Sequence, residues 1–207
     1  MFQRSIFKTF VAAAGLFAAL PAFAAEYTVD KDHSDVGFSI RHLVSKVPGS
    51  FKDYEGTFQF DEKDLKNAKV QFTIKTASID TANAKRDEHL RSADFFNAEK
   101  NPTITFVSKK VTGSGKKFKI EGDMTMLGVT KPVTFNAEYM GAQKDPWGNM
   151  KAGFSASSKI NRKDFGMVFN KVLDSGSLML GEDVTIQLDI EAAQKVAAAA
   201  AAAASNK

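Results

Sequence analysis

Apolar and polar residues alternate along most of the chain in short runs. Positions 36–40 carry apolar side chains at every second residue, and the same period of two returns in seven later segments. Those segments are 56–60, 69–75, 103–106, 118–126, 133–137, 154–156 and 184–190. A period of two is typical of β-strands that have one buried and one solvated face. The pattern therefore predicts an all-β domain built from antiparallel strands.

Residues that favour turns separate these runs. Predicted turns fall at 113–115, 127–132 and 145–149. The segment 80–97 breaks the alternation, and we expect it to hold a short helix across one end of the sheet. A further single turn is expected at 61–65. Strands and helices do not alternate regularly, which argues against a parallel α/β sheet.

So many strands in one domain leave two architectures, a sandwich or a closed barrel. Closure removes the edge strands that invite aggregation. A barrel of about eight strands is just wide enough to be filled by its own side chains or to hold one small ligand. If the inward residues meet at the centre, the protein has only a core. If they line a tube, it has a dry cavity for an apolar molecule.

Two terminal segments differ from the strand-rich domain, which spans 25–193. Residues 1–24 combine basic residues, an uncharged apolar run at 10–20 and a small-residue end, as secretory signal peptides do. The run is shorter than the roughly 20 residues that span a membrane. We therefore expect export to the periplasm with cleavage after Ala24. The alanine-rich segment 194–207 is expected to be a low-complexity tail.

Composition narrows the chemistry. The 207 residues include no cysteine, which excludes disulfides, thiolate metal sites and a cysteine nucleophile. A formal net charge of +4 gives no reason to expect a nucleic-acid partner. The 18 phenylalanines far outnumber the three tyrosines and the one tryptophan, so most of the aromatic surface suits dry surroundings.

A series of motifs runs in order through the domain. They are DHS at 32–34, VGFSIRH at 36–42, SIDT at 78–81, RDEHLRSADFF at 86–96, NPTITF at 101–106, GDMTMLGVTKPV at 122–133, INRKDFG at 160–166 and GEDV at 181–184. On these motifs the chain resembles, across 30–191, the YceI family of exported lipocalin-like proteins. The resemblance implies an extended antiparallel β-barrel whose pore holds the hydrocarbon chain of an isoprenoid. Polyprenols, polyprenyl phosphates and quinone tails are the implied ligands, and none of them calls for a cofactor.

The candidate ligand-binding residues are the apolar positions of the alternating runs. They are Phe38, Ile40, Phe58, Phe60, Phe72, Ile74, Ile104, Phe106, Met124, Met126, Phe135 and Phe154. Methionine adapts its shape and suits a flexible ligand. For each position, ordinary core packing is the alternative. The apolar stretch 166–176 lies among loop signals and is expected either to cover one end of the tube or to be a buried loop.

The predicted helix carries two candidate contacts for a polar headgroup. Arg86 and His89 are three residues apart and would share one helix face, and a guanidinium suits a phosphate. The alternative, which we favour, is a capping and salt-bridge network that pins the insert to the barrel.

The sequence gives little support for a catalytic site or a metal site. His33, Ser34 and Asp35 are consecutive, and because neighbouring strand residues point to opposite faces they cannot form a relay. A metal site would draw on His33, His42 and His89 with carboxylates such as Asp35 and Asp87. These residues lack a tight zinc or calcium spacing, so no metal is expected.

Three interpretations of function follow. The leading one is a non-catalytic periplasmic carrier for an isoprenoid lipid. The second is a stress-response or interaction protein whose barrel core is full, and the third is an enzyme that uses His33, His42 and His89. The lysine-rich hairpin at 109–119 is a candidate for transient contact with anionic lipid headgroups, although we favour a hairpin that is simply solvated. Dimerisation also stays open.

Overall fold

The computed structural model describes residues 24–195. Residues 1–23 of the predicted signal peptide and residues 196–207 of the predicted tail lie outside the described residues. Among the described residues, the helices are too short and too polar to cross a membrane.

Strands make up most of the described chain, as the alternation predicts. The elements in order are β1 (Ala25–His42), β2 (Ser45–Phe51), β3 (Tyr54–Phe60), η1 (Leu65–Asn67), β4 (Lys69–Lys75), η2 (Thr76–Ser78), β5 (Ile79–Asp80), α1 (Ala84–Arg91), β6 (Thr103–Ser114), β7 (Lys117–Met126), β8 (Val129–Lys144), β9 (Met150–Asn161), η3 (Arg162–Phe165) and β10 (Leu180–Gln194).

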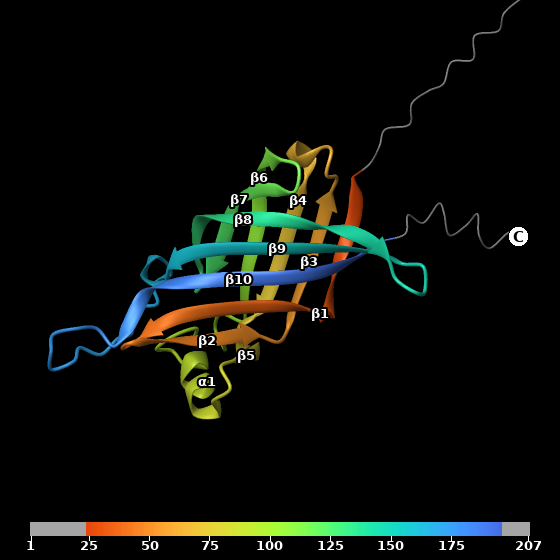
Figure 1. Ribbon diagram of the computed structural model, residues 1–207. Coiled ribbons are helices and arrows are strands. Elements are labelled where there is room, and N and C mark those ends of the chain that lie inside the picture. Colours follow the sequence, from red (N-terminus) through yellow and green to blue (C-terminus); the bar gives the residue numbers. More distant parts are fainter. Residues whose placement is uncertain (1–23, 196–207) are drawn as a thin grey trace, which may run out of the picture.

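Eight antiparallel strands close into a barrel (Figure 1). Hydrogen bonds join them in the order β10-β9-β8-β7-β6-β4-β3-β1, and the ring closes because β1 also pairs with β10. The predicted all-β, lipocalin-like barrel is therefore confirmed, and the sandwich alternative is wrong.

The long strand β1 changes partner along its length. Its first residues, Ala25 to Thr28, pair with β3, whereas Gly37 to His42 pair with β2. The short strand β5 pairs antiparallel with the last residues of β2, and helix α1 contacts β5 at this end of the barrel (Figure 1). At one end of the barrel, β1 and β3 are hydrogen-bonded and the ring of strands is continuous. At the other end they separate, and β2, β5 and α1 lie beside β1.

Helix α1 lies inside the predicted segment 80–97. Asn83 caps it by accepting a hydrogen bond from the backbone N–H of Arg86 at 3.0 Å. The predicted turn at 127–132 is too long. Leu127 and Gly128 both have positive φ, at 54° and 74°, which is the geometry of a tight two-residue hairpin, so β8 begins directly at Val129.

Candidate functional site

A cavity of about 410 Å³ lies inside the barrel. Its size falls within the range of small-molecule sites, roughly 300–1,000 Å³. Most of its lining side chains are apolar and come from the inward faces of the strands, with further residues from α1 and from the loop between η3 and β10. The barrel interior is therefore hollow over part of its length.

Nine of the twelve predicted pore residues line this cavity. They are Phe38, Ile40, Phe72, Ile74, Ile104, Phe106, Met124, Met126 and Phe135. The other three, Phe58, Phe60 and Phe154, do not line it. Alternation identifies which face of a strand points inward, but it carries no information on depth along the barrel axis.

Those three phenylalanines belong to a cluster that fills the other end of the barrel. The ring of Phe60 lies 5.0 Å from those of Tyr139 and Phe154, measured between ring centroids, and 5.7 Å from that of Phe118. We call the cluster the aromatic plug; its members are Tyr27, Phe58, Phe60, Phe118, Tyr139 and Phe154. Both expected uses of the interior thus occur, a packed core at one end and a cavity at the other.

Several lining residues are missing from the sequence-based set. Val184, Ile186 and Leu188 of β10 line the cavity from a run whose alternation is as regular as the others. Phe169 and Met179 come from the loop between η3 and β10, which has no strand pattern. The first group could have been found from periodicity, but the second depends on how the loop folds over the barrel.

The ionisable groups that line the cavity are all basic. They are His42, Arg86, His89, Arg162 and Lys171, and among the described residues the lining includes no aspartate or glutamate. An apolar cavity whose only charged groups are cationic is electrostatically complementary to an apolar molecule with an anionic end.

Arg86 lies at the cavity and also holds α1 in place. Its Nε and Nη2 donate to the hydroxyl and carbonyl oxygens of Thr81, both at 2.7 Å. Asp87 accepts hydrogen bonds from the backbone N–H of Thr81 at 2.9 Å and from its hydroxyl at 2.5 Å. The two predictions for this segment are therefore compatible, because the network pins the helix while Arg86 still lines the cavity.

His89 also lines the cavity, and its ring is held by three neighbours. Its Nε2 lies 2.8 Å from a carboxylate oxygen of Asp94. The ring meets those of Phe95 and Phe169 edge-on, at centroid distances of 5.0 and 5.1 Å. Phe169 thereby connects the loop after η3 to helix α1, and both Phe169 and His89 line the cavity.

Arg162 is a buried cation whose hydrogen bonding is incomplete. The residue is only 1% exposed, and burial lowers the pKa of its guanidinium, opposed in part by nearby Glu182. Its Nε donates to the carbonyl oxygen of Gly181 at 2.9 Å and its Nη1 to that of Met167 at 2.6 Å. Its Nη2 has no hydrogen-bond partner among the described residues. Sequence reasoning did not single this residue out.

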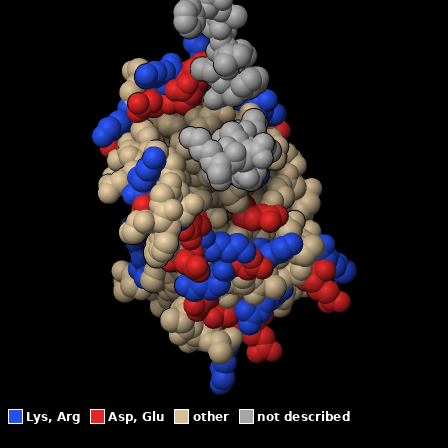
Figure 2. Space-filling view, turned by 90° about the vertical axis from the view of Figure 1, so that its right-hand side faces the viewer, with Lys and Arg blue, Asp and Glu red and all other residues tan. Residues whose placement is uncertain are grey.

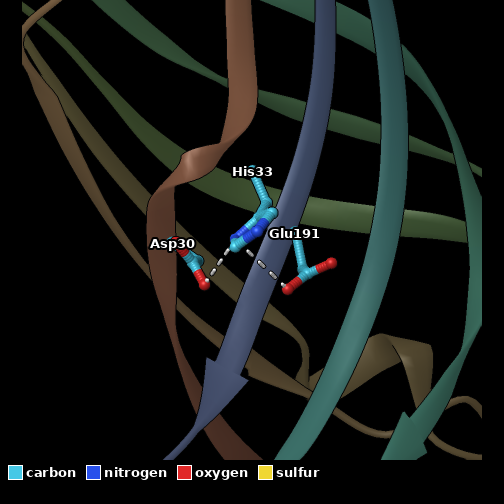
Figure 3. A group of neighbouring side chains, drawn as sticks. All are labelled: Asp30, His33 and Glu191. Carbon is cyan, nitrogen blue, oxygen red and sulfur yellow. Dashed lines mark hydrogen bonds and ion pairs between the residues drawn. The ribbon is translucent and has the colours of Figure 1, made fainter. Parts of the chain in front are cut away.

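The third histidine lies outside the cavity lining. His33 stands in an irregular part of β1, with Nδ1 3.2 Å from Asp30 and 3.9 Å from Glu191 (Figure 3). Lys151 pairs with both carboxylates, and its hydrogen bond is the main cause that lowers the pKa of Asp30. Asp30, His33 and Glu191 could offer metal ligands, but the ammonium of Lys151 already pairs with both carboxylates. His33 is thus separated from His42 and His89, which the enzyme interpretation required to converge.

Comparison with known proteins decides the family. The model of the YceI-like domain matches residues 27–192. The protein YceI of Escherichia coli O157:H7 is 50% identical over 155 residues, which cover 73% of this chain and 81% of that protein. The chain belongs to the YceI-like family.

Solved structures share the YceI-like barrel. The YCEI protein of Campylobacter jejuni is 40% identical, with a TM-score of 0.65 over 82% of this chain and 98% of its own. A polyisoprenoid-binding domain from Saccharophagus degradans is 12% identical, with a TM-score of 0.58 over 84% of this chain and 99% of its own. At that identity the second likeness establishes the fold alone.

Proposed function

We propose that this YceI-like protein is a non-catalytic periplasmic carrier that holds an isoprenoid lipid in its barrel cavity. The observation that carries the proposal is the cavity itself, apolar along its walls and cationic in every charged group that lines it. The polyisoprenoid-binding domain of Saccharophagus degradans, which has a similar fold, supports the class of ligand. The signal-peptide pattern at 1–24 supports the periplasmic location.

Burial against the apolar walls favours the binding of a hydrocarbon chain. Each buried methylene contributes about 0.8 kcal/mol, so an isoprene unit of five carbons contributes roughly 3–4 kcal/mol before the cost of ordering the chain. Binding such a ligand requires a dry cavity of suitable shape and no reactive side chain. A carrier role therefore accounts for the cavity without any catalytic step.

The basic groups favour a particular kind of isoprenoid. Arg86, Arg162 and Lys171 have no acidic partner among the described residues that line the cavity. The phosphate of a polyprenyl phosphate would supply that negative charge. Charge-assisted hydrogen bonds from guanidinium groups to phosphate are stronger than those to a neutral hydroxyl or carbonyl. We therefore rank polyprenyl phosphates above polyprenols and quinones.

Organic extraction of the exported protein, followed by mass spectrometry, tests this function. The expected result is a bound isoprenoid that leaves with the organic phase. The proposal fails if no isoprenoid is recovered and the stripped protein binds neither polyprenyl phosphates, polyprenols nor quinones.

A further inference from the structure

Two exposed segments form a lip beside the cavity. We use the word lip for the β1–β2 hairpin tip at 41–47 together with the loop at 166–180. The backbone N–H of Leu43 donates to the carbonyl oxygen of Met179 at 2.9 Å, and that of Met179 donates to Lys171 at 2.9 Å. The two segments therefore lie side by side, and they project together from one end of the barrel (Figure 1). Lys171 and Met179 line the cavity, so the lip borders its mouth.

The lip gathers exposed apolar side chains. Within residues 24–195, four of the seven large hydrophobic side chains that are exposed belong to it: Leu43, Val44, Val168 and Val172. Val44 is fully exposed, and Val172 is 71% exposed. Apolar side chains grouped at the rim of a cavity indicate a surface that meets another apolar phase.

The charges of the lip favour an anionic partner. Arg41, Lys46 and Lys171 are exposed, and none of them forms an ion pair with another described residue. The one acidic residue of these two segments is Asp174. Basic residues near an anionic membrane contribute about 1 kcal/mol each. Exposed apolar side chains beside basic ones combine the two attractions, burial of apolar area and charge, by which peripheral segments bind anionic membranes.

The opposite end of the barrel is built differently. The lysine-rich hairpin between β6 and β7 adjoins the aromatic plug, because Phe118 near its turn packs on Phe60. Two of its basic side chains, Lys109 and Lys117, pair with Asp123 and Glu138. On the face drawn in Figure 2, basic and acidic side chains are interleaved. Contact through that end would place filled core, not cavity, against the membrane.

We propose that the lip docks on an anionic lipid bilayer, so that the cavity mouth opens onto the membrane. An isoprenoid then passes between bilayer and cavity without exposing its chain to water, which the hydrophobic effect would oppose. This inference rests on the proposed carrier function, since it names the surface from which that carrier loads.

Vesicle flotation tests the lip separately from the cavity. The chain from Ala25 onward, which contains every described strand and helix, is floated with vesicles of phosphatidylglycerol and phosphatidylcholine or of phosphatidylcholine alone. We expect binding to the anionic vesicles that weakens with added salt. The double variant Val44→Asp with Val172→Asp should lower the bound-to-free ratio at least tenfold. The matched control is Trp147→Asp, because Trp147 is 84% exposed at the far end, and it should bind as the unaltered protein does.

Three results would overturn docking by the lip. The first is no flotation of the unaltered protein with either kind of vesicle. The second is loss of flotation in Trp147→Asp with retention in the double variant. The third is a dimer of the free protein that the double variant abolishes while flotation is absent, which would make the lip an interface between copies.

Binding of a polyprenyl phosphate in detergent micelles separates this inference from the proposed function. The double variant should retain that binding, because neither Val44 nor Val172 lines the cavity. If the unaltered protein floats with vesicles but binds no isoprenoid in detergent, the carrier function fails while docking stands.

Discussion

The proposed preference of the cavity for an anionic ligand rests on single residues. The charged groups of the cavity are basic, and Arg162, although almost fully buried, keeps one guanidinium nitrogen without a partner within residues 24–195. A buried guanidinium N–H without an acceptor is costly, and an oxygen of an anionic ligand headgroup would satisfy it. The lining residues thus point to an anionic lipid more strongly than to a neutral one.

The substitution Arg86→Gln tests this electrostatic preference. It removes a charge at the cavity while retaining hydrogen-bonding capacity, and we expect affinity for a polyprenyl phosphate to fall about tenfold, a loss of about 1.4 kcal/mol. Affinity for the polyprenol of equal length should not change. The control Lys85→Gln removes a neighbouring exposed charge that does not line the cavity, and it should leave both affinities unchanged. Equal weakening of both ligands by Arg86→Gln would contradict a role in headgroup binding.

The substitution Ala156→Phe tests whether the cavity is the binding site. Ala156 lines the cavity from β9, and a phenyl ring there would occupy space that the ligand needs. We expect retention of radiolabelled polyprenyl phosphate in gel filtration to be lost. The control Ala142→Phe adds the same ring at an exposed position of β8 and should retain the ligand. Urea unfolding of both variants shows whether the barrel is intact, and a folded Ala156→Phe variant that still binds would exclude this cavity.

At the residue scale, the sequence predicts which side chains point inward but not what surrounds them. The alternation placed Phe60 and Phe72 on the inner face, yet one lies in the aromatic plug and the other lines the cavity. Arg162 sits directly after β9 in a 3-10 turn, where no periodicity applies. Its burial follows from hydrogen bonds to the carbonyl oxygens of Gly181 and Met167. No sequence pattern predicts these contacts.

Among the elements, β1 contains the largest irregularity of the barrel. Asp30 pairs with Glu191 and Asp35 with Asp189, so four residues of β1 lie opposite one of β10. Ser34 fills this bulge: its hydroxyl donates to the carbonyl oxygen of Asp30 at 2.6 Å and accepts from the N–H of Glu191 at 3.0 Å. The bulge thus has its own internal hydrogen bonds, and the cluster around Lys151 stabilises it further.

The stability supplied by Asp30 should depend on pH. Its pKa is lowered in the folded protein, chiefly by the hydrogen bond from Lys151, so its contribution is present above the unfolded pKa of about 3.9 and is lost as pH falls through the folded value. We expect Asp30→Asn to lower the free energy of unfolding by about 1–2 kcal/mol at pH 7, because the ion pair is partly exposed. Urea unfolding should show this difference shrinking below about pH 4. A difference in unfolding free energy between the two proteins that stays constant from pH 7 to pH 2 would contradict a stabilising role for the ionised Asp30.

The aromatic plug should limit the length of chain that the cavity accepts. Phe60 is buried among Phe118, Tyr139 and Phe154, and Phe60→Ala would leave a void in line with the cavity. We expect a loss of about 3–5 kcal/mol in the free energy of unfolding. A series of polyprenyl phosphates of increasing length should show the preference moving to longer chains. An unchanged length preference in the folded variant would mean that the plug does not set the limit.

At the element scale, strands with strict alternation are predictable and the others are not. The strand β2 has Pro48 and Gly49 in its sequence and no period of two, so no pattern marks it. It forms because the second half of β1 leaves β3 and needs another partner. The loop at 166–180 is similar, since Phe169 lies against His89 and Phe95, residues that are distant in the chain.

The whole molecule has two unlike ends. At one end the ring of strands is closed around the aromatic plug, and at the other β2, β5 and α1 add to the lining of the cavity beside the exposed lip. Under the proposed docking, the ligand chain would point from the lip toward the plug. The resemblance to YceI proteins implied an apolar tube, whereas the division of that tube into a cavity and a plug required the structure.

Native mass spectrometry of the stripped protein with polyprenyl phosphates of defined length tests the carrier function most directly. The expected result is a complex of one protein and one lipid that survives removal of detergent and that Ala156→Phe abolishes. Absence of any bound lipid at saturating concentration, in protein whose barrel is shown to be folded, would contradict it.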